Sequence, residues 1–248
     1  IKNILKKIKK YLRNPIKIPM ISKIYNNYIK ILIDLFLALI LLIFLSPIFV
    51  IIIILLRFSG EGEIFFFQKR IGYKMRNIKI FKFATMLKNS PEIGDKLYTA
   101  ENDGRILKIG KFLRQTKLNE LPQIINILLG NMSIVGPRPL VEDTFNFYSE
   151  TGKQKITIVK PGITGLSSIF FSKEDKLLKN VLDKKDFYKK EIAPIKEKLE
   201  IFYVDNISLF LDIKIIVCTF LKLVGFSNLI LIKFFPKVET IIRDAKSI

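Results

Sequence analysis

A long apolar segment constrains this chain more than any other feature of its sequence. Residues 31–56 are almost wholly apolar, interrupted only by Asp34, Ser46 and Pro47. As one helix, these roughly 26 residues would reach about 39 Å, which exceeds the ~30 Å hydrocarbon core of a bilayer. The segment is too long, and begins too far into the chain, to be a cleavable signal peptide. The sequence therefore predicts attachment to a membrane through this segment.

Two arrangements of the segment are compatible with its sequence. Hydropathy and length favour a straight spanning helix. Basic residues flank both ends, at Lys23, Lys30, Arg57, Lys69 and Arg70. The charge asymmetry that orients a spanning helix is therefore weak. Pro47 removes a backbone donor and crowds the preceding turn, so we expect a kink at Ser46-Pro47. A kinked helix could be re-entrant, entering and leaving the membrane on one face.

The charge of the chain points to an anionic partner. Lys and Arg number 42 against 22 Asp and Glu, a net charge of +20, while 50% of the residues are hydrophobic. Anionic membrane lipids attract basic residues near the surface at roughly 1 kcal/mol each. Biased genome composition is the other source of such an excess. No nucleic-acid motif accompanies the charge, so we expect no nucleic acid as a partner.

The lack of histidine and the single cysteine limit the catalytic groups that this chain can use. The chain has no histidine, which excludes Ser-His-Asp triads and histidine-ligated zinc. A single cysteine, Cys218, excludes an internal disulfide framework and is expected to be a small buried hydrophobe. Catalysis would have to use carboxylates, lysine, arginine or a divalent metal.

The remaining segments predict an α+β, mostly helical fold. We expect a basic amphipathic segment over 1–23, the membrane helix over 24–57, a cytoplasmic domain over 58–220 and a C-terminal interfacial segment over 221–248. Residues 64–68 and 78–83 read as strands, with Lys79 and Lys82 expected on one face. Because Pro122 cannot lie deep in a helix, a helix should begin close to it, with Asn119 at the N-cap and Gly130 at its end.

The stretch 117–139 carries the most specific signal. It begins Lys-Leu-Asn-Glu-Leu-Pro-Gln at Lys117 and ends Ser-Ile-Val-Gly-Pro-Arg-Pro at Pro139. This stretch closely resembles the signature of the bacterial sugar transferases, also called small monotopic phosphoglycosyl transferases. The resemblance extends over residues 24–219 and includes the segments 102–105, 110–114 and 159–165.

The resemblance implies both an architecture and a reaction. The architecture is a re-entrant membrane helix broken at Ser46 and Pro47, with a small α/β catalytic domain on the cytoplasmic face of the bacterial inner membrane. The reaction moves a sugar-1-phosphate from a UDP-sugar to polyprenyl (undecaprenyl) phosphate and releases UMP. It starts a surface glycan on its lipid carrier. A homodimer is left open.

The resemblance also assigns candidate site residues by their position in the motifs. Asn119, Glu120, Arg114 and Lys82 fall on catalytic positions, and Glu120 falls on the ligand of Mg²⁺. Arg105 and the turn Pro137, Arg138 and Pro139 fall on positions that bind substrate phosphate. These residue types suit the chemistry, because Mg²⁺ takes a carboxylate together with phosphate oxygens and arginine pairs with phosphate in a forked geometry.

Asn119 stands where the family has the aspartate nucleophile, and an amide is a far weaker nucleophile than a carboxylate. Another carboxylate, Glu120, Glu142 or Asp143, would have to attack, or the lipid phosphate would attack directly. Alternatively, the chain is a catalytically silent member that binds substrate or scaffolds a glycan-assembly complex. A basic peripheral membrane or nucleic-acid-binding protein is the remaining alternative.

Overall fold

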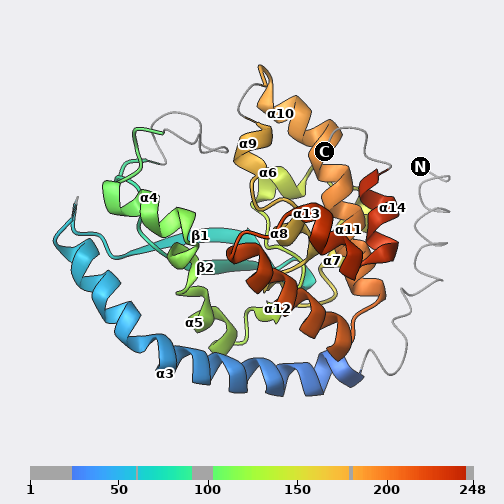
Figure 1. Ribbon diagram of the computed structural model, residues 1–248, viewed down its shortest axis with the longest axis horizontal. Helices are drawn as coiled ribbons and strands as arrows, with labels where there is room; N and C mark the ends of the chain where they lie inside the picture. Colours follow the sequence, from blue (N-terminus) through green and yellow to red (C-terminus); the bar gives the residue numbers. More distant parts are fainter. Residues whose placement is uncertain (1–23, 60, 91–102, 179–180, 244–248) are drawn as a thin grey trace.

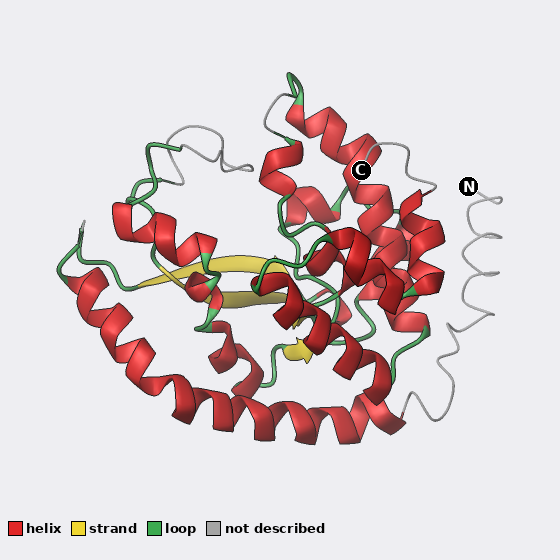
Figure 2. Ribbon diagram, viewed as in Figure 1, coloured by secondary structure: helices red, strands yellow, loops and turns green. Residues whose placement is uncertain are grey.

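The computed structural model describes residues 24–59, 61–90, 103–178 and 181–243. It is mostly helical with two small sheets, which confirms the expected fold class (Figures 1 and 2). The amphipathic segment expected over 1–23 lies outside the described residues. The strands are β1 (Phe65–Ile71), β2 (Asn77–Phe83), β3 (Ser133–Val135) and β4 (Gly162–Thr164). The helices are α3 (Lys30–Arg57), α4 (Lys108–Gln115), α5 (Gln123–Leu128), α6 (Glu142–Phe145), α7 (Glu150–Ile156), α8 (Leu166–Phe170), α9 (Glu174–Leu177), α10 (Lys184–Phe187), α11 (Ala193–Asp205), α12 (Leu209–Leu223), α13 (Asn228–Leu231) and α14 (Pro236–Arg243).

The apolar segment forms one helix, α3, which is preceded by a single π-helical turn at Tyr25–Ile29. Among the described residues, this is the one helix long and apolar enough to cross a membrane. Helical structure continues through Pro47, and α3 bends along its length in Figure 1. Proline cannot bond the carbonyl of Ile43, four residues back, but the hydroxyl of Ser46 donates to that carbonyl at 2.7 Å. A side-chain donor of this kind lets a proline remain in an apolar helix.

One face of α3 packs against the rest of the protein along the whole helix. Lys30 and Asp34 are buried near its start, Ala38 packs in a cluster with Ile124 and Ile127 of α5, and Leu56 is buried near its end. The opposite face exposes large apolar side chains, among them Leu32, Phe36, Leu39, Ile43, Phe44, Ile51 and Ile54. The helix therefore lies lengthwise on the domain, with an apolar face left over.

The strands β1 and β2 form the predicted antiparallel hairpin, with Phe66 opposite Lys82. The expectation that Lys79 and Lys82 share a face is wrong, because side chains three positions apart in a strand point to opposite faces. Lys79 is exposed, whereas the side chain of Lys82 is only 15% exposed. The second sheet is parallel and pairs Ser133 with Gly162.

The main core surrounds α11, whose Leu199, Tyr203 and Val204 are fully buried. The segment beyond residue 220, expected at the membrane interface, contributes Leu231, Phe235 and Val238 to this core and keeps Phe226, Ile230 and Phe234 partly exposed. Cys218 is free and buried, as predicted.

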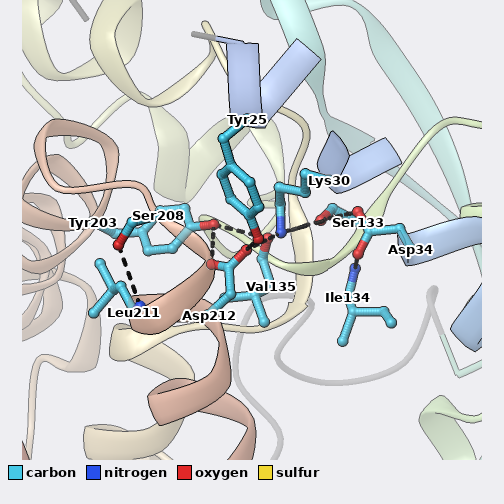
Figure 3. A network of polar contacts seen from close by, with 10 residues as sticks. All are labelled: Tyr25, Lys30, Asp34, Ser133, Ile134, Val135, Tyr203, Ser208, Leu211 and Asp212. Carbon is cyan, nitrogen blue, oxygen red and sulfur yellow. Dashed lines mark hydrogen bonds and ion pairs between the residues drawn. The ribbon is translucent and has the colours of Figure 1, made fainter. Parts of the chain in front are cut away.

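A buried polar network attaches the start of α3 to α12 and β3 (Figure 3). Asp212 of α12 accepts hydrogen bonds from Tyr25 at 2.7 Å and from Tyr203 at 2.8 Å, and pairs with Lys30 at 2.5 Å. Asp34 accepts a hydrogen bond from the Ser133 hydroxyl at 2.6 Å. Because these side chains are shielded from water, removing one of them would leave its partner buried without a counter-charge or hydrogen bond.

Replacing Asp212 should therefore weaken the attachment of α3. Asp212→Ala leaves Lys30 buried without its closest anion, and removing one partner of a buried pair costs about 3–5 kcal/mol. The control is Asp205→Ala, which breaks a half-exposed pair with Lys155 (2.7 Å) and should cost less than about 1 kcal/mol. The measurement is the free energy of unfolding by denaturant in detergent. Equal losses in the two variants would contradict the role of the network.

Candidate active site

Lys82 of β2 and Glu120 lie side by side because the side chain of Asn126 fixes α5 to the edge of β2. Asn126 of α5 is fully buried; its amide nitrogen donates to the Lys79 carbonyl at 2.7 Å, and its oxygen accepts from the Phe81 amide at 2.9 Å. It thereby satisfies two backbone groups of β2 that would otherwise lack partners. The short turn Leu118–Glu120 precedes α5, so anchoring α5 on β2 places Glu120 beside Lys82.

The turn Pro137-Arg138-Pro139 follows β3 and is held on both sides. The Pro137 carbonyl accepts from the Gly162 amide at 2.9 Å, and the Pro139 carbonyl accepts from Arg70 at 3.3 Å. The turn can lie this close to β4 because position 162 is glycine: a Cβ there would sit 2.1 Å from the Gly136 nitrogen. The two prolines therefore frame Arg138 and present it to the hairpin.

Glu120 lies among several cations. Its Oε1 is 3.3 Å from Nη2 of Arg138 and 3.6 Å from Nζ of Lys82, and its side chain is 16% exposed. Arg70 donates from β1 to Gln68 at 2.6 Å and lies close enough to Glu120 and Arg138 to interact with their charges. We call Lys82, Glu120, Arg138 and Arg70 the charged cluster. Three cations against one carboxylate leave it with excess positive charge.

The pKa values of the cluster follow from burial and from this charge balance. Burial lowers the pKa of Lys82 to about 7; Glu120 opposes the shift, and repulsion by the neighbouring arginines adds to it. Burial also disfavours the carboxylate of Glu120, but Arg138, Lys82 and Lys117 outweigh that effect and hold its pKa at about 2. Burial lowers the pKa of Arg70 to about 10, and repulsion by Arg138 adds to the shift. Glu120 is therefore an anion at neutral pH, in surroundings suited to further negative charge.

Two of the predicted basic residues lie at the margin. Arg114 of α4 donates to the Thr85 hydroxyl at 3.5 Å, and its charge acts on Lys82. Arg105 pairs with Asp103 at 2.5 Å and donates to the Ser90 carbonyl at 3.0 Å. The structure thus brings Lys82, Glu120 and Arg138 together, with Arg114 nearby, and the Arg105 side chain contacts Asp103 and Ser90. Ser46 and Pro47 lie on the exposed face of α3.

Asn119 does not cap a helix, and the expectation that it would is wrong. It lies inside the turn Leu118–Glu120, whose N-cap is Lys117 in a left-handed conformation, and α5 begins only after Pro122. The Asn119 side chain is 8% exposed, and its Oδ1 has no hydrogen-bond partner among the described residues. The predicted end of α5 is correct, because Gly130 follows it with a φ of 73°.

The alternative carboxylates separate by position. Glu142 and Asp143 are exposed in the first turn of α6, whereas Glu120 contacts Lys82 and Arg138.

Arg70 belongs to the cluster but was not among the predicted site residues, because in the sequence it stands out only as a basic residue flanking the apolar segment. A signal was available, because Arg70 lies an even number of positions from Phe66, which is opposite Lys82, so the two cations share a face.

Comparison with known proteins agrees with this arrangement. The sequence model of the family described as "Bacterial sugar transferase" matches residues 25–225, which include the charged cluster and α3. This chain belongs to the bacterial sugar transferase family.

Several known proteins are similar to long parts of this chain. The "Exopolysaccharide production protein PSS" of Rhizobium leguminosarum bv. phaseoli is 31% identical over 193 residues, covering 74% of this chain and 88% of that protein. The "Exopolysaccharide production protein ExoY" of Sinorhizobium fredii (strain NBRC 101917 / NGR234) is 36% identical over 150 residues, 55% of this chain and 66% of that protein. The "UDP-glucose:undecaprenyl-phosphate glucose-1-phosphate transferase" of Klebsiella pneumoniae is 37% identical over 208 residues, 82% of this chain but 41% of that protein. The chain therefore spans less than half the length of this last relative.

The low pKa of Glu120 predicts an acid-labile contribution to stability. Its folded-state pKa of about 2 lies below its ordinary 4.5, so the contribution is present above pH 4.5 and is lost as the pH falls toward 2. Glu120→Gln should therefore lower the free energy of unfolding at neutral pH by on the order of 3 kcal/mol, and by progressively less in acid. Glu150→Gln, at an exposed ion pair with Lys153, is the control and should change little. A loss in Glu120→Gln that is independent of pH would contradict the assignment.

Proposed function

We propose that this protein transfers a sugar-1-phosphate from a UDP-sugar to undecaprenyl phosphate or a related polyprenyl phosphate. The product would start a surface glycan such as capsule, O-antigen, exopolysaccharide or a glycoprotein glycan. The observation that carries the proposal is the charged cluster, in which cations outnumber the carboxylate and which lies in the same domain as a helix with an exposed apolar face. The name of the Klebsiella pneumoniae relative, which specifies undecaprenyl phosphate, supports the choice of acceptor.

The cluster has the groups that phosphoryl transfer needs. Arg138, Lys82 and Arg70 would bind the diphosphate of the donor and stabilise the negative charge that develops as UMP leaves. Binding a phosphate would also favour the charged form of Lys82, whose pKa of about 7 leaves it partly neutral in the free protein. A bound phosphate would therefore supply the negative charge that the cations of the cluster lack in the free protein.

Mg²⁺ is part of the proposal. Among the described residues, no group of three or more acidic, histidine or cysteine side chains is placed to hold a metal ion. Mg²⁺ usually takes only one or two protein oxygens and completes its shell with water and substrate phosphates. Glu120 and the unpartnered Oδ1 of Asn119 fit that requirement and would hold the ion once the donor is bound. The ion would neutralise charge on the phosphates.

Asn119 leaves two routes for the transfer. In one, a Glu120 oxygen attacks the phosphorus that carries the sugar, the bond to the bridging oxygen breaks, and UMP leaves with that oxygen. An oxygen of the lipid phosphate then attacks the same phosphorus, and the bond to Glu120 breaks and frees its carboxylate. In the other, an oxygen of the lipid phosphate attacks the same phosphorus directly and releases UMP in one step. The exposure of Glu142 and Asp143 favours Glu120 as the protein nucleophile.

The function predicts that UMP is released from a UDP-sugar in the presence of undecaprenyl phosphate and Mg²⁺, and that EDTA abolishes the release. The experiment screens UDP-sugars and measures UMP. Intact-mass analysis with the donor alone separates the two routes, because a phosphosugar adduct on Glu120 indicates the covalent one and UMP release only with lipid indicates the direct one.

Asn119→Asp is the matched variant, because it restores the family's carboxylate with almost no change in volume. We expect it to raise turnover about tenfold or more and to form the adduct, since a carboxylate is the stronger nucleophile and tenfold corresponds to about 1.4 kcal/mol. UMP release from neither the wild type nor Asn119→Asp would contradict the enzymatic function. Retained binding of a UDP-sugar would then favour the silent binding protein.

The position of the helix is also part of the proposal: α3 enters and leaves the membrane on the cytoplasmic face. Residues near both of its ends, Lys30 and Leu56, are buried against the same domain. A helix that crossed the ~30 Å core would carry these two contacts to opposite sides of the bilayer. The packing along α3 therefore supports a helix that lies in one leaflet with its apolar face toward lipid.

Cysteine labelling tests this topology, because Cys218 is the chain's one cysteine and can be replaced by serine. Single cysteines at Asn27 and Ser59, on either side of α3, should both react with an impermeant maleimide only from the cytoplasmic side. A cysteine at the exposed Lys185 reports the side on which the domain lies. Labelling of Asn27 and Ser59 from opposite sides would show that α3 spans the membrane.

A further inference from the structure

The Pro137-Arg138-Pro139 turn has a single backbone N–H, and that donor is bonded to a side chain from the core. Neither proline has an N–H, so the amide of Arg138 is the only backbone donor in the tripeptide. That amide donates to Oε1 of Glu200 at 3.1 Å. The acceptor comes from α11, 62 positions further along the chain. The orientation of Arg138 is thus coupled to a carboxyl group in the core.

Glu200 is an unusual residue to find at this depth. It is 2% exposed, between the fully buried Leu199 and Tyr203 on the same helix. Its Oε1 also accepts from the Ser167 hydroxyl, while its Oε2 has no hydrogen-bond partner among the described residues. Burial raises its pKa to about 7, against the opposing effects of Ser167, the Arg138 amide and Lys196. A carboxyl group that is this costly to bury and only half satisfied adds little to stability by itself.

The position of Glu200 next to the Arg138 turn, and not a gain in stability, accounts for a carboxyl group at this depth. It lies beneath the turn that presents Arg138 to Glu120, and the Arg138 guanidinium reaches Glu120 at 3.3 Å. Arg70 also holds the turn, because it donates to the Pro139 carbonyl at 3.3 Å. Glu200 and Arg70 are therefore both bonded to the backbone of the turn, at successive residues.

We propose that Glu200 is a positioning residue, which holds the Arg138 guanidinium in the charged cluster by accepting the backbone N–H of the proline-framed turn. Glu200 would not touch the substrate. Its effect on transfer passes through Arg138, so this inference rests on the proposed role of Arg138 in binding phosphate.

The chain offers a matched control on the same helix. Glu197 of α11 accepts the backbone N–H of Ser149 at 3.1 Å and also the hydroxyl of Ser149, but it does so at the start of α7 and away from the charged cluster. Glu200 and Glu197 therefore make the same kinds of bond, one to the Arg138 turn and one to an ordinary helix start. Loss of either should cost stability, and only loss of Glu200 should move Arg138.

The experiment compares Glu200→Ala, Glu200→Gln and Glu197→Ala in the full chain. The first readout needs no substrate: the rate at which phenylglyoxal modifies Arg138, followed by peptide mass spectrometry. We expect faster modification in Glu200→Ala, because Arg138 no longer has a fixed place beside Glu120, and unchanged modification in Glu197→Ala. Glu200→Gln keeps an oxygen acceptor and should restore most of the protection.

The second readout is UMP release under steady-state conditions. In Glu200→Ala we expect kcat/KM to fall by about tenfold, the factor that corresponds to losing one hydrogen bond. Glu200→Gln should recover most of this activity, and Glu197→Ala should retain wild-type values at temperatures where it is folded. Unfolding curves for all variants identify those temperatures.

The two readouts separate failure of this inference from failure of the proposed function. Unchanged modification of Arg138 in folded Glu200→Ala would overturn the positioning role, whatever the activity. Equal acceleration of Arg138 modification in Glu200→Ala and Glu197→Ala would overturn it as well, since the effect would then be general loosening. Absence of UMP release from the wild type would count against the function, while the modification rates would still decide the role of Glu200.

Discussion

The buried pair between Lys30 and Asp212 is the interaction on which the arrangement of the molecule depends. The two residues are 182 positions apart and meet at 2.5 Å, each shielded from water. Buried charges are tolerated only when they are paired and hydrogen bonded, so the contact allows one register of α3 against α12. With that register set, Ala38 packs on α5 and Leu56 packs beside Phe83 at the end of β2. The position of α3 and the positions of β2 and α5, which place the charged cluster, are therefore set together.

The charged cluster shows how a site is assembled by satisfying backbone groups elsewhere. Asn126 completes the edge of β2 and carries Glu120 to Lys82, while Glu200 and Arg70 hold the proline-framed turn that carries Arg138. Each of these side chains replaces a backbone partner that the local chain lacks. The cluster is unbalanced in charge, since three cations surround one carboxylate. This excess positive charge is the basis of the proposed binding of phosphate groups.

Local patterns predicted the elements whose cause is local. The alternating apolar residues of 78–83 predicted β2, and the glycine at 130 predicted the end of α5. The expected N-cap at Asn119 is wrong, because the chain forms a separate turn before α5. Pro122 was expected inside the first turns of a helix, but a separate turn forms before it, and Asn119 is left inside that turn with an unpartnered oxygen. At Pro47 the helix continues while α3 bends along its length (Figure 1), and the hydroxyl of Ser46 satisfies the carbonyl that proline leaves free.

The sequence by itself determined that the chain carries an apolar segment long enough to cross a membrane, that its chemistry excludes histidine, and that its signature places it among the bacterial sugar transferases. These conclusions rest on composition and on contiguous motifs, which can be read without distances. The tertiary structure alone decided that α3 lies lengthwise on the domain, that Arg70 joins Lys82 and Arg138, and that Glu200 lies beneath the Arg138 turn. The physical reason is that each of these contacts joins residues far apart in the chain. Their meeting depends on packing and on the pairing of buried polar groups, which no local periodicity records.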